Sequence, residues 1–223
     1  MQFVETIPTE FTYFAWNIDL HTAGPFVRPS DHRRSALEKI RRVARDLDAH
    51  NGVHRVRLFE STFIPPLPDR PRFDVILLTD SDGPVRAEFD VARKRHDVPD
   101  PALVTAATNA ARFGDTDNLD GPILLNHFVG ETDPQTAISA WKTISQWYAS
   151  VLDVTNSTLL EFEPGTPYLI VNYAVVPGPV PRFMANQLLR PSFYRNVNRR
   201  LGKIGARARP LFAKRVAYAE GGA

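Results

Sequence analysis

The sequence predicts an α+β protein built from two similar halves, each with the element order strand, helix, strand, strand, helix, strand. Three observations predict it. Runs of aromatic and β-branched residues alternate with segments of helical periodicity. The tripeptide Gly-Pro-Val occurs at 83–85 and again at 178–180, each time after the third expected strand of its half. The matches LFE at 58–60 and EFE at 161–163 keep the same order, which chance rarely preserves across several elements.

The first half is expected to span residues 10–116. Ser30 before Asp31 is a plausible N-cap, and Asn51-Gly52 tolerates the left-handed backbone found just past a helix end. A proline-rich turn (IPPLPDRP) separates the second and third strands. Strands are expected at 13–20, 53–61 and 72–79, one helix opening at Ser30, and a second helix ending near His96.

The fourth strand of this half has two readings. Residues 103–113 (LVTAATNAARF) could supply the strand. The same stretch could be a helix capped by Asp100, with Pro101 at its first position and Gly114 at its end.

The second half is expected to span residues 120–218. Thr132-Asp133-Pro134 is a strong helix start, because it offers a capping side chain and a proline at the first helical position. Gly178-Pro179-Val180 opens another helix. Strands are expected at 123–130, 157–163, 168–176 and 211–218.

This repeated order is the split βαβ, or ferredoxin-like, plan. Two tandem halves resemble the dimeric α+β barrel superfamily in its single-chain form, and RFDVILLTDSDGPV at 72–85 is similar to its third strand and following helix start. The resemblance implies a pseudo-dimeric barrel with two facing four-stranded sheets and helices outside. Members include monooxygenases, haem enzymes, dehydratases, stress proteins and domains without known activity, so the fold alone does not give a function.

Composition removes several classes of function. The 223 residues include no cysteine, which excludes disulfides, thiolate metal sites and a cysteine nucleophile. No run approaches the roughly 20 apolar residues of a membrane span, and the best run, 168–176, contains Asn172. The N-terminus lacks a signal-peptide pattern, so we expect a soluble, cytoplasmic protein. No glycine-rich phosphate loop, GxSxG or HExxH motif is present, which argues against nucleotide-dependent chemistry.

His127 is the catalytic candidate. Strand alternation places it on one face with Ile123, Leu125 and Val129. A histidine among apolar neighbours could be an axial haem ligand or a general base. The favoured reading is a core histidine that is hydrogen-bonded to backbone or to a tyrosine, because the sequence fixes no partner carboxylate.

Asn17 and Asn126 are the first ligand-binding candidates, because they occupy equivalent places in the first strand of each half. In a pseudo-twofold barrel they could face a shared cavity. Equally, each could satisfy backbone groups at a strand irregularity. Asn126 and His127 point to opposite faces unless a bulge intervenes.

Asp19 and His21 flank the end of the first strand and are the other ligand-binding candidates, for a metal ion or proton transfer. No metal site is expected, because the six histidines show no repeated ligand spacing. Arg55 and Arg57 on one strand are interpreted as an exposed face.

Charge is unevenly distributed. Residues 164–219 hold ten Lys and Arg and no acid, whereas residues 1–163 hold 17 basic and 24 acidic residues. Such a segment could pack on the acidic remainder of its own chain or of a second subunit, face water, or lie on anionic lipid, and nucleic acid ranks last.

Two functions follow. The first is a small-molecule-binding or oxidative α+β barrel acting on an apolar ligand, with haem as the cofactor to be tested and a homo-oligomer as one assembly. The second is a non-catalytic interaction protein that uses the basic C-terminal segment to contact an acidic partner or a membrane surface.

Overall fold

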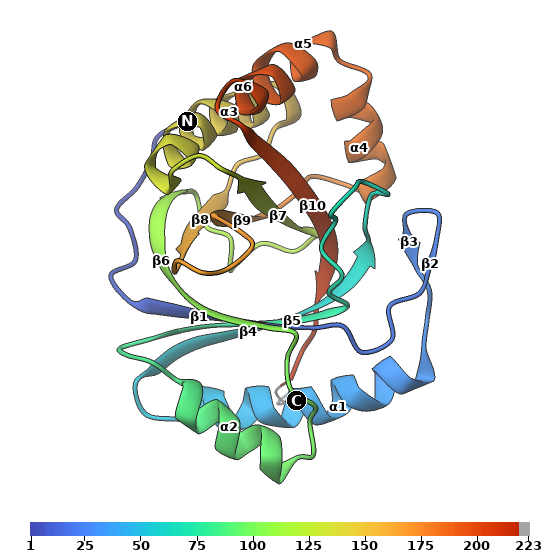
Figure 1. Ribbon diagram of the computed structural model, residues 1–223, viewed down its shortest axis with the longest axis vertical. Coiled ribbons are helices and arrows are strands. Elements are labelled where there is room, and N and C mark those ends of the chain that lie inside the picture. The colour runs from blue at the N-terminus through green and yellow to red at the C-terminus, as the bar shows by residue number, and fades with distance from the viewer. Residues whose placement is uncertain (219–223) are drawn as a thin grey trace. The chain divides into compact units, whose positions relative to one another are not determined.

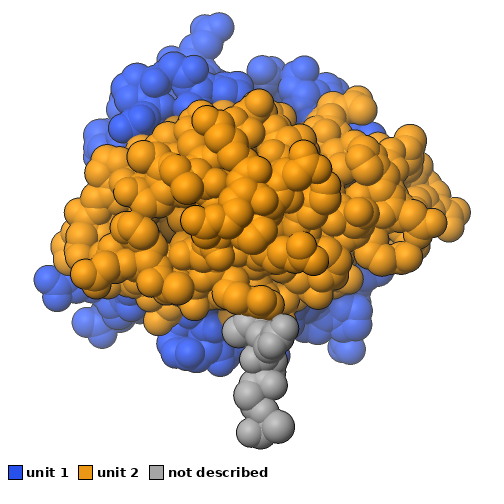
Figure 2. All heavy atoms as spheres, turned by 90° about the horizontal axis from the view of Figure 1, so that it is seen from below, with its two compact units in different colours: residues 1–7, 67–71, 109–212 blue, residues 8–66, 72–108, 213–223 orange. Residues whose placement is uncertain are grey.

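The computed structural model describes residues 1–218 (Figure 1). The chain divides into two compact units. Unit 1 comprises Met1–Ile7, Leu67–Pro71 and Asn109–Phe212. Unit 2 comprises Pro8–Pro66, Arg72–Thr108 and the described residues from Ala213 on. Figure 2 shows unit 1 in blue and unit 2 in orange. The boundaries expected from the sequence, 10–116 and 120–218, stay predictions.

The central strands of unit 2 pair antiparallel. A short hairpin of β2 (Thr22–Ala23) and β3 (Phe26–Val27) extends the sheet beyond β4 (Val53–Phe63). The strand β10 (Ala206–Arg215) also pairs with β4. In pairing order the strands are β6 (Leu103–Phe113), β1 (Glu10–Trp16), β5 (Val75–Ser81), β4 (Val53–Phe63), β3 (Phe26–Val27) and β2 (Thr22–Ala23).

Helices α1 (Asp31–Asp48) and α2 (Arg86–Arg95) cover one face of this sheet (Figure 1). Helix α1 begins where the sequence predicts, because the Ser30 side chain accepts a hydrogen bond from the Arg33 amide at 3.1 Å. Its buried stripe packs on the aromatic rings of the sheet and of α2, where Phe14 and Phe89 stack with centroids 3.9 Å apart. This cluster is the core of unit 2.

In unit 1 the sheet runs from β10 through β7 (Ile123–Gly130), β9 (Ile170–Val175) and β8 (Ser157–Phe162) to the last residues of β6. β9 is antiparallel to both β7 and β8. Each unit therefore uses part of β6 and part of β10, because both strands cross the division between the units.

Helix α3 (Pro134–Leu152) is the long helix of unit 1. Asp133 caps it by accepting a hydrogen bond from the Thr136 amide at 2.9 Å, with Pro134 in the first turn. Phe3 packs against Phe113 and Trp141, with ring centroids 6.1 and 5.9 Å away. Four short helical elements follow β9: α4 (Val180–Leu188), α5 (Pro191–Phe193), the π-helical turn η1 (Tyr194–Asn198) and α6 (Arg199–Lys203).

The hydrogen-bonded order of the strands is β10-β7-β9-β8-β6-β1-β5-β4-β3-β2, and β10 also pairs with β4. The order of the eight long strands is thus closed, in a mixed α+β fold. Within each of the two halves expected from the sequence, the fourth strand pairs with the first, the first with the third and the third with the second.

The structure decides between the alternatives for residues 103–113: they form β6, so the helix reading was wrong. Burial along β6 alternates between residues, as in a strand with unequal faces. The first strand ends at Trp16 rather than near Leu20, because the Asp74 carboxylate accepts hydrogen bonds from the Ile18 and Asp19 amides beyond it. The last strand begins at Ala206 rather than Leu211 and ends at Arg215.

The expectation that Arg57 lies on an exposed face was wrong. Its side chain is 2% exposed and forms an ion pair with Asp80, whose side chain is 8% exposed, at 3.1 Å. The guanidinium also lies 5.8 Å from the centre of the Phe11 ring. Arg57 lies on the face opposite the helices, as alternation predicts, but that face is buried as well, as the uninterrupted burial of β5 shows.

Replacing Arg57 with methionine leaves the Asp80 carboxylate buried without this ion pair. We expect the free energy of unfolding, measured by urea denaturation, to fall by about 3–5 kcal/mol. The double variant Arg57→Met/Asp80→Leu removes both charges and should recover most of the loss. Equal losses in the single and double variants would show that the unpaired carboxylate is not the cause.

Candidate functional site

A cavity of about 30 Å³ lies in unit 1 between the sheet and helix α3, and is called the α3 cavity below. Strands β7 and β9 form its floor and α3 covers it. This volume holds a water molecule or two, whereas a benzene-sized ligand needs about 150 Å³. Its walls are mostly apolar, from Phe113, Leu124, Phe128, Trp141, Ile144 and Val154.

Asn126 is the polar residue of the α3 cavity that stands out. In the antiparallel register of β7 and β9 it lies directly opposite Asn172, which also lines the cavity. The Asn126 Oδ1 atom is buried and accepts no hydrogen bond. Leaving a buried acceptor unsatisfied costs about 1–3 kcal/mol. The position is therefore suited to a ligand, or a water molecule, that donates a hydrogen bond.

The other polar groups of the α3 cavity already have partners. The Asn172 amide donates to Ser157 Oγ at 3.2 Å, and that hydroxyl donates to the Tyr173 carbonyl at 3.4 Å. Ser145 Oγ donates to the Lys142 carbonyl at 2.9 Å. Asn126 Oδ1 is thus the unsatisfied acceptor of this cavity among the residues that the structure describes.

Two hydrogen bonds hold α3 against the helices that follow β9. Tyr148 donates from its hydroxyl to Gln187 Oε1 in α4 at 2.9 Å, and Trp147 Nε1 donates to Ser192 Oγ in α5 at 3.3 Å. Burial raises the pKa of the Tyr148 hydroxyl above its usual value, so this group stays protonated and acts as a donor. A ligand larger than water requires this helical layer to move or its side chains to rotate.

His127 is fully buried and does not line the α3 cavity. Its strand neighbour Asn126 faces that cavity, so His127 points to the opposite face, as alternation predicts. Its ring lies 4.8 Å, centroid to centroid, from the Tyr168 ring. Burial lowers the pKa of His127 to about 3, against hydrogen bonds to backbone groups of Arg209 and Leu125 that raise it. The imidazole is therefore neutral at physiological pH. Its catalytic role stays a prediction.

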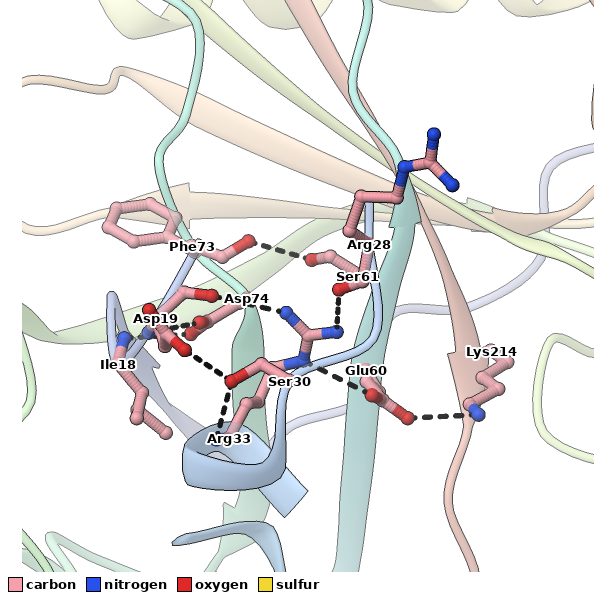
Figure 3. A network of polar contacts seen from close by, with 10 residues as sticks. All are labelled: Ile18, Asp19, Arg28, Ser30, Arg33, Glu60, Ser61, Phe73, Asp74 and Lys214. Carbon is pink, nitrogen blue, oxygen red and sulfur yellow. Dashed lines mark hydrogen bonds and ion pairs between the residues drawn. The ribbon is translucent and has the colours of Figure 1, made fainter. Parts of the chain in front are cut away.

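The other three candidates lie in unit 2. Asn17 is exposed just beyond the end of β1, so it lies outside a strand and does not line the α3 cavity. Asp19 belongs to a polar network at the start of α1 (Figure 3): Ser30 donates its hydroxyl to the Asp19 carboxylate, and this bond is the main cause that holds the Asp19 pKa below its usual value. His21, which is largely exposed, pairs with Asp19 at 2.7 Å. The network anchors the β1–α1 connection.

The described residues contain no group of three or more His, Asp and Glu side chains that could hold a metal ion. Ser157 and Tyr148 also line the cavity and were not predicted from the sequence, in which Asn172 was interpreted only as an interruption of an apolar run. Asn172 could have been found by the same signal that identified Asn126, a lone amide within an apolar strand.

The ten basic residues of the segment 164–219 lie between the start of α4 and the end of β10. Its apolar side chains Phe183, Phe193, Val197 and Leu201 are buried, whereas Leu188, Leu189 and Tyr194 are exposed. Two of its cations reach the acidic residues that the sequence suggested as partners: Lys214 pairs with Glu60 at 2.9 Å, and Arg209 lies 3.9 Å from Asp69. Within the described residues, no helix combines the length and the hydropathy needed to cross a membrane.

No family model and no curated protein matches the chain. Solved structures of similar fold cover nearly all of it. An anthrone oxidase-like protein is 11% identical with a TM-score of 0.55, over 95% of this chain and 93% of that chain. A mutant chlorite dismutase from Candidatus Nitrospira defluvii is 8% identical with a TM-score of 0.54, over 96% and 94%. A haem-binding protein from Thermus thermophilus is 10% identical with a TM-score of 0.52, over 97% and 94%. The chain therefore has the fold of the dimeric α+β barrel superfamily.

Because the pKa of His127 is about 3 in the folded protein and ordinarily 6.5, the unfolded chain binds one more proton between these values. The stability that neutral His127 contributes is complete above pH 6.5 and is lost as the pH falls. We expect the free energy of unfolding to drop by up to about 1.4 kcal/mol per pH unit from this group. The free energy of unfolding, measured by urea denaturation at several pH values between 6.5 and 5, should fall less steeply with falling pH in His127→Gln than in the parent protein. Parallel curves for the two proteins would refute the assignment.

Proposed function

We propose that the chain binds a small apolar molecule at the α3 cavity, which widens when the helical layer over it moves, and that Asn126 orients the molecule by accepting a hydrogen bond. The observation that supports this proposal is the buried Asn126 Oδ1 without a partner in an otherwise apolar wall. Binding sites of this kind combine apolar walls with a few placed polar groups. The neighbours in fold, which include a haem-binding protein and an anthrone oxidase-like protein, also favour a small-molecule ligand.

The duplicated architecture is part of the same proposal. We infer that the two halves are tandem ferredoxin-like units forming a pseudo-dimer, which the matching strand orders of the two halves support. The halves have diverged in their polar residues. Asn126 lies within β7, whereas Asn17 lies beyond the end of β1. The ligand site is therefore assigned to the second half alone.

A haem does not fit the α3 cavity. The cavity of about 30 Å³ is far smaller than a haem. Haem iron is held by histidine, cysteine, methionine or tyrosine side chains. No histidine or methionine lines the cavity, the chain has no cysteine, and the hydroxyl of Tyr148 is already bonded to Gln187. The proposal is therefore a haem-independent ligand site. Oxidation of the bound molecule stays a prediction, and it is supported by fold neighbours such as the anthrone oxidase-like protein.

The non-catalytic alternative, contact with a membrane surface or an acidic partner, is not favoured by these neighbours. We also propose a homo-oligomer as the assembly, and the support for it is the similarity to these fold neighbours.

Two probes of equal size test the proposed ligand site: 4-fluorophenol, which carries a hydrogen-bond donor, and 4-fluorotoluene, which does not. In ¹⁹F NMR titrations we expect the phenol to bind roughly 5- to 30-fold more tightly, the worth of one hydrogen bond. In Asn126→Leu, which keeps a similar volume and removes the acceptor, that preference should disappear.

Asn17→Leu is the matched control, because it makes the same change at an exposed asparagine outside the α3 cavity. It should bind both probes as the parent protein does. If neither probe binds, or if Asn126→Leu keeps the preference for the phenol, the α3 cavity holds only water and the proposal is wrong.

Hemin tests the haem-independent part separately. Titrated into the purified protein, it should give no Soret band shifted from that of free hemin. A stoichiometric shifted band that survives desalting would contradict the misfit between haem and this cavity. Repeating the titration with Tyr148→Phe would then show whether this tyrosine is the ligand.

A further inference from the structure

Three arginines are buried among the residues that the structure describes, and two of them have a carboxylate partner. Arg33 donates to Glu60 at 3.3 Å and to the backbone carbonyls of Asp19 and Arg28, as part of the network in Figure 3. Arg57 donates to Asp80 at 3.1 Å. The third, Arg209, is 7% exposed and differs from both.

Among the described residues, Arg209 has no carboxylate within hydrogen-bond distance. Its Nη1 donates to the carbonyl of its neighbour Ala208 at 3.1 Å. Its Nη2 lies 3.9 Å from Asp69 Oδ2, and its buried Nε makes no hydrogen bond. A guanidinium carries five N–H donors in a planar fork that matches the two oxygens of an oxyanion. The Nε donor of this fork is unused.

A buried charge without a bonded counter-ion is costly, which is why buried arginines are normally paired as Arg33 and Arg57 are. His127 cannot provide the missing negative charge, because its imidazole is neutral and its hydrogen bond is to the Arg209 backbone. The side chain of Arg209 is thus ready to bind an anion that the fold itself does not supply.

Asp69 is a weak counter-ion. It lies in the loop Leu67–Pro71 of unit 1, its side chain is 78% exposed, and its backbone is left-handed with φ of 51°. An exposed carboxylate 3.9 Å away is well solvated and contributes little to an ion pair. It nevertheless shows that a carboxylate can approach Nη2 from the solvent side, so the guanidinium is within reach of a dissolved anion.

We propose that Arg209 is the anchor of an oxyanion-binding site, which takes a carboxylate or phosphate group in the place that Asp69 approaches. The ligand oxygens accept hydrogen bonds from Nη2 and, once a turn of the side chain uncovers it, from the neighbouring Nε, the bidentate geometry that a guanidinium offers. Asp69 competes with the ligand for the same donors. This site is independent of the α3 cavity, because neither Arg209 nor Asp69 lines that cavity.

Two anions test the site and separate its sources: sodium phosphate, for a free inorganic ion, and sodium benzoate, for an organic carboxylate. Thermal unfolding is followed at constant ionic strength, adjusted with sodium chloride. We expect at least one probe to raise the melting temperature saturably, as binding to the folded state requires. The probe with the lower apparent dissociation constant identifies the class of ligand.

Three variants make the result specific, and a fourth serves as their control. Arg209→Met should weaken binding at least tenfold and, without probe, have a higher urea midpoint than the parent protein, because it removes an uncompensated buried charge. Arg209→Lys keeps the charge but not the fork, and should bind several-fold more weakly. Asp69→Asn removes the competing carboxylate at a position where asparagine tolerates the left-handed backbone, so binding should tighten several-fold.

Arg207→Met is the control, since it removes an equal charge from an exposed position on the same strand. It should bind the probes as the parent protein does. Equal weakening in Arg207→Met and Arg209→Met would assign the effect to general surface charge. No saturable shift with either probe, or a lower urea midpoint for Arg209→Met, would overturn the proposal. If Arg209→Met does not fold, that lower stability also counts against it, and the lysine and Asp69→Asn variants still test the anion.

Discussion

Burial of both faces of the central strands is the constraint on which the rest of the structure depends. Every residue of β5 and of β9 is buried, and β1 is buried after its first residue. Strand alternation then sends each side chain to one dry face or the other. A polar residue in such a strand must find a partner or leave a donor or acceptor unsatisfied. The distribution of these partners is what distinguishes the proposed binding positions from the structural ones.

Most buried polar groups meet this constraint internally. Asp80 has Arg57, Asn172 has Ser157, and Asn156 bonds twice to the backbone of Val175. The exceptions that bear on binding are Asn126 Oδ1 and the Arg209 fork. The neutral, apolar surroundings of Asn126 favour an uncharged ligand that donates a hydrogen bond, whereas the Arg209 cation favours an anion. Two such exceptions within unit 1 fit a protein that binds molecules, because unsatisfied groups destabilise the ligand-free fold.

The order of elements could be predicted because its signals are local. Ser30, Asp133 and the two Gly-Pro-Val segments act within a few residues of the helix that each begins. The end of β1 could not be predicted, because it is set by the carboxylate of Asp74, which is 55 residues from Asp19 in sequence. The burial of Arg57 was missed for a related reason: the pattern of one strand does not reveal whether its second face is covered.

The candidate site was predicted in part. A polar residue within an apolar strand drew attention to Asn126, whose role in binding stays a prediction. Alternation placed Asn126 and His127 on opposite faces, and the structure confirms this, because Asn126 lines the α3 cavity and His127 does not. Its covering layer was not predicted, because Tyr148 is indistinguishable from its apolar neighbours in the helical stripe until its contact with Gln187 is known. Arg209 was one of ten basic residues in an unbroken basic segment. Only the path of β10 shows that this one is buried while Arg207, two positions earlier, faces water.

The two strands that cross between the units also bear on how the protein is made. Unit 2 contains the N-terminal strand β1, yet its last hydrogen bonds come from the far end of the chain: Val216 donates to the Leu58 carbonyl, and the Tyr218 hydroxyl donates to the carbonyl of Val56, 162 residues earlier. On a ribosome, β1, β4 and β5 are therefore made well before β10, and the part of the β4 edge that β3 does not cover stays open until β10 is made. An open edge invites pairing with other chains. Chaperone protection during synthesis would matter most for this N-terminal sheet.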